Sequence, residues 1–397
     1  MSSYNKKRLK VLIPIRYPVG GIRTYLKYTH GSLDKNSYEF TFIAPSKVWL
    51  DRIKYDFSDH EVKIINTKKE ESSYSMLLAL LKVLVGNKFD LLHSQGYTAG
   101  ILGVFINSVF HVPHIITLHR TFGEGQFSNT FWDEHTLIKK RLIEFMLSKA
   151  DIIQTVSYDA QENLLEYFPG LRKKAKKIVV IRNGINTNQF EENAPVQNKP
   201  IIRESGKFTI GFLGRYMPEK GFPYLIETVD RLVNEFNKTA VKVVSVGGFG
   251  GFIREYQKEI NDKGLTSYFK FLGFFDNVAP ILREIDLLVI PSLGEACPLV
   301  PMEALVCGTP VIAFSCNGLS EVLMDTPAIM VPVKDSEGMA KEIIRIMENY
   351  EYVKNNFDNF ATRAKERFDV TITVNKLRDL FADLTSKRQA TSMYFKK

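Results

Sequence analysis

Short apolar runs alternate along the chain with stretches in which apolar residues recur at helical spacing. The runs KVLIPI (residues 10–15) and HIITLH (114–119) are rich in β-branched residues, and helical stretches such as YSMLLALLKVLV (74–85) lie between such runs. Strands that are apolar throughout and alternate with amphipathic helices are typical of parallel sheets with helices on both faces. The pattern therefore predicts an α/β fold.

One polar stretch interrupts this alternation. EENAPVQNKPIIRESGK (191–207) contains two prolines and little apolar periodicity, which is typical of a linker between domains. The alternation then starts again and ends in a helical pattern that no strand follows. We therefore expect an N-terminal domain over residues 1–194, a second α/β domain over 195–370, a deep cleft between them, and a final helix over 371–397 that returns to the first domain.

The composition agrees with a two-domain globular protein. The 397 residues exceed what one hydrophobic core usually supports, and apolar residues at 45% with charged residues at 24% are close to globular averages. The best candidate for a membrane span, MLLALLKVLVG (76–86), is interrupted by Lys82 and has about half of the ~20 residues required. The cysteines lack CxxC spacing, and all 7 histidines lie before residue 136. We expect a reduced, cytoplasmic protein without a metal.

The formal net charge of +9 predicts attraction to an anionic partner. Nucleic acid is not expected, because no zinc-finger, RRM or basic-zipper pattern is present. Basic clusters occur at 139–141 (KKR), 172–177 (RKKAKK) and 395–397 (FKK). They are either ordinary solvated faces or contacts to an anionic membrane surface.

The segment DLLVIPSLGEACPLVPMEALVCGTPVIAF (286–314) predicts a buried strand, a loop that carries Glu295, and a helix. With Pro298 in the first helical turn, the N–H groups of Leu299 and Val300 are free to meet a phosphate at the positive end of the helix dipole. Glu303, inside the helix, could accept hydrogen bonds from ribose hydroxyls.

The spacing of the two glutamates argues against an acid/base pair. Eight residues on a helix span about 12 Å, which is longer than the roughly 5 to 9.5 Å between paired glycosidase carboxylates. We therefore expect Glu295 to face a sugar while Glu303 binds a ribose. The alternative is that both are ordinary carboxylates near a helix terminus.

GFLGRYMPEKGF (211–222) predicts another strand and a loop that carries Arg215 and Lys220. A guanidinium and an ammonium can neutralise a leaving nucleoside diphosphate without a metal. Each residue alone could be a surface charge. Two charged loops at the carboxyl ends of strands in one domain favour a ligand site, because open α/β sheets bind ligands there.

The first half offers weaker signals. Gly20 and Gly21 follow the first strand, where backbone can approach a phosphate, although a tight turn also needs glycine. His119 ends a strand beside Arg120, and it could face a cleft or be satisfied by backbone groups. VGGFGGFIREY (246–256) lacks the third glycine of the dinucleotide fingerprint, so we do not expect NAD.

Together these elements resemble the retaining, metal-independent glycosyltransferases of family four, which have the GT-B fold. The matching motifs are GG at 20–21, TLH at 117–119, NGI at 183–185, GRYMPEKG at 214–221, and Glu295-x7-Glu303 followed by ALVCGTPVIA at 304–313. The resemblance implies two Rossmann-like domains whose parallel sheets face across a cleft. The second domain would hold a nucleotide-sugar and the first most of the acceptor.

The resemblance also implies roles for single residues. Arg215 and Lys220 would grip the diphosphate, Glu303 the ribose and Glu295 the donor sugar, and His119 would lie beside the reacting carbon. The other predicted donor contacts are Gly20, Gly21, Gly214, Phe274, Pro298, Leu299 and Val300.

Three departures from the family pattern affect this transfer of roles. Arg120 stands where the family often has aspartate, which leaves the acceptor side open. GGFGG (247–251) replaces a common GDGP-like loop, and Cys297 and Pro298 fill positions often held by aromatic and glycine residues.

We therefore predict that a sugar moves, with retention of configuration, from a UDP-sugar to a glycan or lipid-linked acceptor in polysaccharide biosynthesis. A donor phosphate oxygen would help to remove the acceptor proton, and no cofactor, metal or enzymic nucleophile is needed. Peripheral contact with the cytoplasmic membrane face is compatible with the basic charge. Two alternatives stay open, a non-hydrolysing nucleotide-sugar epimerase and a catalytically silent subunit that holds a partner glycosyltransferase.

Overall fold

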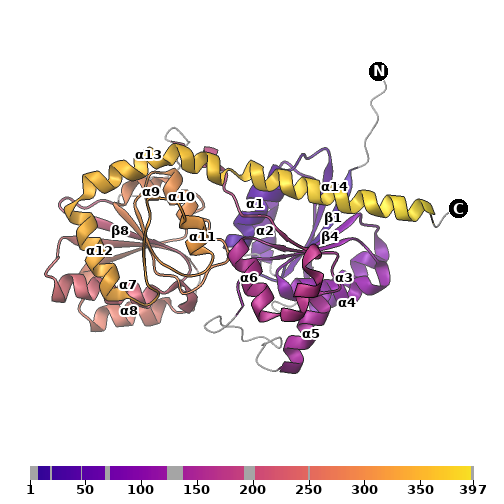
Figure 1. The fold of residues 1–397 in the computed structure, drawn as a ribbon, viewed down its shortest axis with the longest axis horizontal. Helices are drawn as coiled ribbons and strands as arrows, with labels where there is room; N and C mark the ends of the chain where they lie inside the picture. Colours follow the sequence, from indigo (N-terminus) through magenta and orange to yellow (C-terminus); the bar gives the residue numbers. More distant parts are fainter. Residues whose placement is uncertain are drawn as a thin grey trace, which may run out of the picture. The chain divides into compact units, whose positions relative to one another are not determined.

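The computed structural model describes residues 8–17, 20–45, 47–67, 72–122, 137–191, 202–248 and 251–394. These residues form two compact units (Figure 1). Unit 1 contains the described residues up to Gly184 together with the chain from Val370 onward, and unit 2 contains those from Ile185 to Asp369. The boundary expected between residues 194 and 195 lies outside the described residues.

Unit 1 is built on a seven-stranded parallel sheet with the order β3-β2-β1-β4-β5-β6-β7. Because β1 pairs with both β2 and β4, the direction of winding reverses between β1 and β4. Open α/β sheets bind their ligands at such switch points. The strands are β1 (Leu9–Pro14), β2 (Tyr38–Pro45), β3 (Val62–Thr67), β4 (Leu91–Gln95), β5 (His114–Leu118), β6 (Ile152–Thr155) and β7 (Ile178–Val180).

Helices cover both faces of this sheet. One core joins strands β1 and β2 to α1, α2 and the last helix, whose Leu377 and Phe381 are completely buried. A second core on the opposite face joins the strands to α3 and α4, and α4 also packs on α5. The helices are α1 (Gly21–Thr29), α2 (Lys47–Asp56), α3 (Ser73–Gly86), α4 (Tyr97–Phe110), α5 (Leu137–Leu147), α6 (Tyr158–Tyr167) and α14 (Val370–Tyr394), with 3₁₀ turns η1 (His30–Ser32) and η2 (Pro169–Lys177).

Unit 2 repeats the plan with a six-stranded parallel sheet of order β10-β9-β8-β11-β12-β13. Its switch point lies between β8 and β11, because β8 pairs with both β9 and β11. The strands are β8 (Phe208–Leu213), β9 (Val241–Val246), β10 (Phe269–Gly273), β11 (Leu287–Ile290), β12 (Val311–Phe314) and β13 (Ile329–Val331).

Helix α12 of unit 2 begins at a residue suited to that position. Asp335 caps α12 by accepting a hydrogen bond from the Gly338 amide at 2.8 Å. The helices are α7 (Phe222–Asp230), α8 (Ile253–Asp262), α9 (Ala279–Glu284), α10 (Val300–Val306), α11 (Leu319–Leu323), α12 (Ser336–Glu348) and α13 (Tyr350–Phe368), with the 3₁₀ turns η3 (Thr187–Phe190), η4 (Pro218–Lys220) and η6 (Thr266–Tyr268) and the π-helical turn η5 (Arg231–Glu235).

The α/β prediction is confirmed, since both sheets are parallel and the runs KVLIPI and HIITLH form β1 and β5. Each of these strands is buried over most of its length, which explains why the runs are continuous rather than alternating. Both units are Rossmann-like.

Candidate active site

The predicted donor residues of unit 2 lie in loops at the carboxyl edge of its sheet. Gly214, Arg215 and Lys220 follow β8, Glu295 follows β11, and Phe274 follows β10. Since β8 and β11 are neighbours, Lys220 and Glu295 meet at the switch point of the sheet. The strand order therefore brings together residues that are far apart in the sequence. Gly214 and Glu295, 81 positions apart, follow adjacent strands.

Glycines allow the backbones of these loops to touch. Gly221 has φ +68°, and a Cβ atom on it would lie 1.7 Å from the carbonyl oxygen of Pro291 in the neighbouring loop. A Cβ atom on Gly247 would lie 1.9 Å from the carbonyl oxygen of Gly214. Any side chain at either position would push the loops apart, so glycine is required for close packing at this edge.

Lys220 and Glu295 form a partly buried ion pair. The Lys220 Nζ atom lies 2.6 Å from Glu295 Oε1, which also accepts a hydrogen bond from Ser292 Oγ at 2.9 Å. The loop backbone is fixed as well, because the Glu295 amide donates to the Asn317 carbonyl at 3.3 Å. A cation and an anion are thus held together at the strand end.

The sequence reasoning missed Ser292 as a partner of Glu295. Its position could have suggested the role, since it stands two residues after the end of β11 and three residues before the glutamate.

Arg215 is more exposed than Lys220. Its Nη2 atom lies 3.5 Å from Glu219 Oε1 within the same loop, and the side chain of Arg215 is 41% exposed. An exposed ion pair of this kind contributes little to stability, so the guanidinium can move to another anion at small cost. Glu219 was also missed, although it stands inside the GRYMPEKG motif.

The carboxyl group of Glu303 is buried and has no hydrogen-bond partner among the described residues. The residue lies on α10, and only 6% of its surface is exposed. Burial raises the pKa of Glu303 to about 7. A buried carboxylate without donors is a group that a ligand hydroxyl can satisfy.

Two expectations about the Glu295–Glu303 segment were wrong. Pro298 does not lie in the first turn of α10, because the helix begins at Val300 with Leu299 at its N-cap, and Pro301 is the proline of the first turn. Glu295 therefore stands before the helix. The rise of about 12 Å, which assumes a helix over all eight residues, does not apply to this irregular segment.

The predicted residues of unit 1 also lie near a switch point. Gly20, with φ +54°, follows β1, and Gly21 begins α1 with open space where a Cβ atom would lie. His119 follows β5, and Gln95 ends the adjacent β4.

The ring of His119 is held by two contacts. Its Nε2 atom lies 2.8 Å from Gln95 Oε1, and the ring packs edge-on against Tyr25, with 4.7 Å between centroids. An amide oxygen only accepts, so Nε2 carries the proton. Because burial lowers the pKa of His119 to about 3, the ring is neutral and Nδ1 is a free acceptor.

Gln95 was missed by the sequence reasoning. The signal that could have found it is the parallel pairing of LLHSQ (91–95) with HIITL (114–118), which brings the two strand ends together.

Further neutral histidines lie behind this point. His30 Nε2 and His93 Nδ1 are 3.0 Å apart, and His93 Nε2 lies 2.7 Å from Thr117 Oγ1. Both rings are completely buried, and burial lowers the pKa of His30 to about 3. These histidines are thus neutral hydrogen-bonding groups, while the cations Arg16 and Arg120 stand just after β1 and β5.

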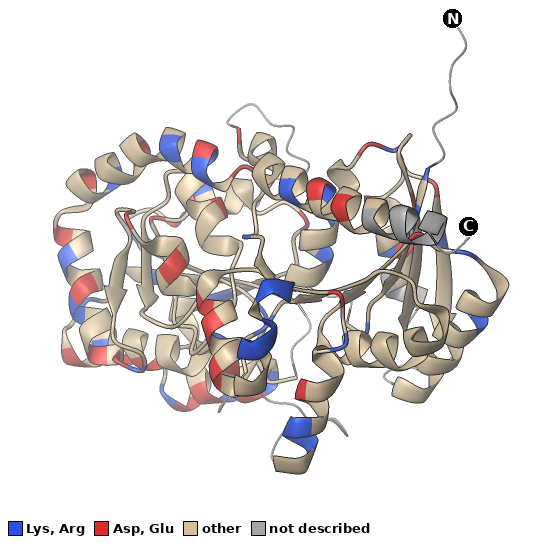
Figure 2. Cartoon of the chain, turned by 45° about the vertical axis from the view of Figure 1, so that its right-hand side comes forward, with Lys and Arg blue, Asp and Glu red and all other residues tan. Residues whose placement is uncertain are grey.

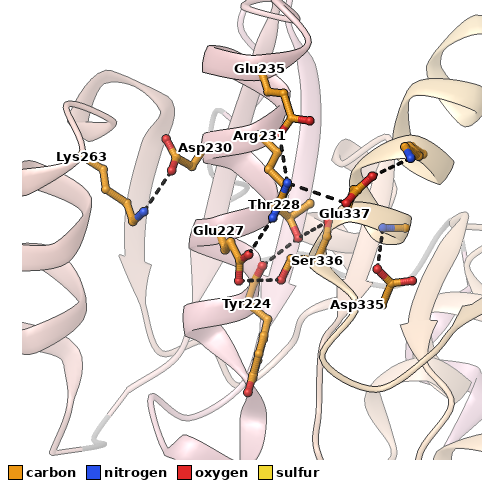
Figure 3. Close-up of polar contacts among 12 residues, drawn as sticks. Tyr224, Glu227, Thr228, Asp230, Arg231, Glu235, Lys263, Asp335, Ser336 and Glu337 are labelled. Carbon is orange, nitrogen blue, oxygen red and sulfur yellow. Dashed lines mark hydrogen bonds and ion pairs between the residues drawn. The ribbon is translucent and has the colours of Figure 1, made fainter.

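Another group of charged residues surrounds an open hollow of about 760 Å³ on α7 and α8 (Figure 3). Arg231 pairs there with Glu227 and Glu235, and Lys263 pairs with Asp230 at 2.9 Å. None of the predicted site residues lines this hollow. Its lining has four acidic and two basic side chains, and both basic ones are already paired with acidic neighbours, so we do not assign a ligand to it.

None of the helices in the described ranges is long and apolar enough to cross a bilayer.

Comparison with known proteins covers both units. Residues 19–189 match the family described as Glycosyltransferase Family 4, and residues 207–349 match the family described as Glycosyl transferases group 1. Among solved structures, Anabaena Alr3699/HepE in complex with UDP and glucose aligns with a TM-score of 0.78 at 19% identity, covering 95% of this chain and 100% of that one.

Two curated relatives illustrate the range of activities in such proteins. The UDP-Gal:alpha-D-GlcNAc-diphosphoundecaprenol alpha-1,3-galactosyltransferase of Escherichia coli is 25% identical over 78% of this chain and 79% of that protein. The phosphatidyl-myo-inositol mannosyltransferase of Mycolicibacterium smegmatis is 26% identical over 91% of this chain and 89% of that protein.

Proposed function

Because the chain belongs to the family-4 glycosyltransferases of the GT-B fold, we propose that it transfers a sugar from a UDP-sugar to an acceptor with retention of anomeric configuration. Structural neighbours hold UDP or UDP-glucose, which supports a nucleotide-sugar donor. The observation that carries the proposal is the combination, at one sheet edge, of the Lys220–Glu295 pair with the unpartnered buried carboxyl of Glu303.

Each of these groups fits one part of such a donor. Two ribose hydroxyls would donate to Glu303, whose carboxyl accepts no hydrogen bond from the residues that the structure describes. Arg215 and Lys220 would neutralise the diphosphate as it leaves, which removes the need for a metal ion. Glu295, held by Lys220 and Ser292, would accept hydrogen bonds from the sugar.

The reaction needs no enzymic nucleophile in this proposal. The bond between the anomeric carbon and the diphosphate oxygen breaks, the acceptor oxygen attacks from the same face, and its proton passes to a donor phosphate oxygen. The free Nδ1 atom of neutral His119 would accept a hydrogen bond from a sugar hydroxyl. Gly20 and Gly21 are proposed donor phosphate contacts.

We propose a lipid-linked or cell-surface glycan as the acceptor. Two curated relatives are named for substrates on lipids, diphosphoundecaprenol and phosphatidyl-myo-inositol, and this chain carries a net charge of +9 that favours anionic surfaces. The protein would then act in polysaccharide biosynthesis at the cytoplasmic face of a membrane.

The test is a panel of nucleotide-sugars scored by diphosphate release, with and without lipid extract, and by the anomeric configuration of the product. Arg215→Ala and Glu303→Ala should each lower turnover at least about tenfold, because each removes a group that contacts the donor. Lys341→Ala, at an exposed ion pair with Glu337, is the matched control. Near-normal rates in both site variants would overturn the assignment.

A further inference from the structure

Three adjacent helices of unit 1 present apolar side chains to solvent. Helices α3, α4 and α5 lie on one face of the sheet, and α4 contacts both neighbours (Figure 1). Val85, Val109 and Ile138, one on each helix, are 70%, 73% and 82% exposed. The other exposed apolar side chains of this α3–α5 face include Tyr74, Leu78, Leu81, Phe105, Leu142 and Phe145.

The exposed apolar positions follow helical spacing. On α3, residues 74, 78, 81 and 85 form a stripe, while Met76, Leu80 and Val83 are buried in the core. The helix is therefore apolar on both sides. Helices α3 and α4 together contain one charged residue, Lys82, whereas a helix that borders water usually carries charges on its outer side. Contiguous exposed apolar surface of this kind marks an interaction site.

Basic residues border the α3–α5 face at one end. Helix α5 begins at Leu137 and carries Lys139, Lys140 and Arg141 close to its first turn, visible as a blue band in Figure 2. The turn η2 lies against α5, because the Gly170 amide donates to the Glu144 carboxylate. The exposed basic side chains of η2 are Arg172, Lys173, Lys174 and Lys176.

Acidic residues are almost absent from this surface. Glu144 is the single carboxylate on α3, α4 and α5, and its bond to the Gly170 amide already engages it. The surface therefore combines exposed apolar side chains with more basic than acidic groups, although Arg172 of η2 pairs with Glu162 at 3.1 Å.

We propose that the α3–α5 face is the surface by which this protein lies on an anionic bilayer. The apolar side chains would enter the boundary between headgroups and acyl chains, while the basic side chains of α5 and η2 contact lipid phosphates. A second copy of the chain fits poorly, since two such faces would bring like charges together. A protein partner is less well matched, because lysine is depleted at protein interfaces.

This inference deepens the proposed function, since a lipid-linked acceptor lies in such a bilayer, but its test does not depend on activity. Purified full-length protein is sedimented with vesicles of phosphatidylcholine alone and of phosphatidylcholine mixed with phosphatidylglycerol. We expect binding to the mixed vesicles that weakens as salt rises, and little binding to phosphatidylcholine alone.

Two variants separate the apolar and basic contributions. Ile138→Ser with Phe145→Ser should weaken binding to mixed vesicles about tenfold, and Lys139→Glu with Arg141→Glu should do so by a similar factor. All four side chains are exposed, so the fold should be retained, as melting curves will check. Tyr352→Ser, which removes an exposed apolar side chain from α13 of unit 2, is the control and should bind like the parent.

Equal binding by parent and both variants would overturn the proposal, as would no binding to mixed vesicles at low salt. A doubled mass in solution that Ile138→Ser with Phe145→Ser abolishes would also overturn it, in favour of a dimer. Vesicle binding through this face without sugar transfer would support the surface while contradicting the proposed function.

Discussion

The two sheets share one strand order apart from the additional β7, but the predicted site residues at their strand ends differ in charge. In unit 2 the strand ends hold the Lys220–Glu295 pair, the cation of Arg215 and the buried carboxyl of Glu303. In unit 1 the corresponding place holds His119, bound to an amide oxygen and kept neutral by burial. The topology supplies a place for a ligand, and the residue types decide whether that place suits a charged diphosphate or a neutral hydroxyl.

Acid should affect the two units in opposite directions, and this is the largest effect that we expect. Burial lowers the pKa of His30 and His114 from 6.5 to about 3, so between these pH values the unfolded chain binds more protons and unit 1 loses stability as pH falls. At pH 5 the loss is about 2 kcal/mol per histidine. In unit 2, the pKa of Glu303 is raised from 4.5 to about 7, so this group lowers the stability of unit 2 progressively as pH rises from about 4.5 to about 7.

Hydrogen exchange at pH 5 and pH 8, corrected for intrinsic exchange rates, separates the two responses. Core peptides of unit 1 should lose protection at the lower pH and those of unit 2 should not. Parallel loss of protection in both units would contradict the contrast between a neutral and a charged region.

Glu303→Gln should sharpen the comparison by removing the buried charge. Above pH 7 the ionised carboxylate is destabilising in the folded, ligand-free protein, because its pKa is raised from 4.5 to about 7. The variant should therefore unfold with a free energy up to roughly 3 kcal/mol higher at pH 8, and with little change at pH 4. Amide hydrogen exchange of unit 2 peptides at increasing urea concentrations measures this free energy of unfolding.

Glu337→Gln, at an exposed carboxylate of the same unit, is the control for that experiment and should show no such pH dependence. If Glu303→Gln is destabilised at pH 8, its carboxylate has partners in solution and the assignment as an unpartnered group fails.

Lys220→Met should break the charged pair directly. Glu295 would be left without its cation, and the departing diphosphate would lose one of two positive groups. We expect turnover to fall about 100-fold, equivalent to about 2.7 kcal/mol of transition-state stabilisation. Diphosphate release measures the rate, and Lys341→Met provides a matched exposed lysine. A loss smaller than about threefold would remove Lys220 from the proposed site.

Gln95→Leu tests the site of the neutral His119 in unit 1 and has the smallest expected effect. Without the amide oxygen, the proton of His119 is no longer held on Nε2, and ¹⁵N spectra of labelled histidine should show a mixture of the two neutral forms. Turnover should fall about fivefold, or about 1 kcal/mol. Gln95→Glu should instead raise the pKa of His119, which shifts the acid limb of the pH profile upward. Unchanged ¹⁵N shifts in both variants would show that Gln95 does not position the ring.

The sequence predicted the strands well because buried parallel strands are apolar on both faces, as in HIITL (114–118). It also predicted that Lys220 and Glu295 share a sheet edge, since each follows a strand. It did not find Gln95, because the partner of Gln95 is set by which strands are neighbours. It also missed Ser292, although its partner Glu295 lies only three residues away in the same loop. The start of α10 was misplaced because Pro298 and Pro301 both suit a first turn, and only the folded chain distinguishes them.

The last helix, α14, has a consequence for how the protein is made. Its Leu377 and Phe381 fill the core of unit 1, and the Phe381 ring lies 5.4 Å from that of His93. A ribosome releases the N-terminal part of unit 1 first, yet this helix emerges only after all of unit 2. Unit 1, whose synthesis starts first, therefore completes its core last. Until then, water can reach His30 and His93, which are completely buried in the native protein.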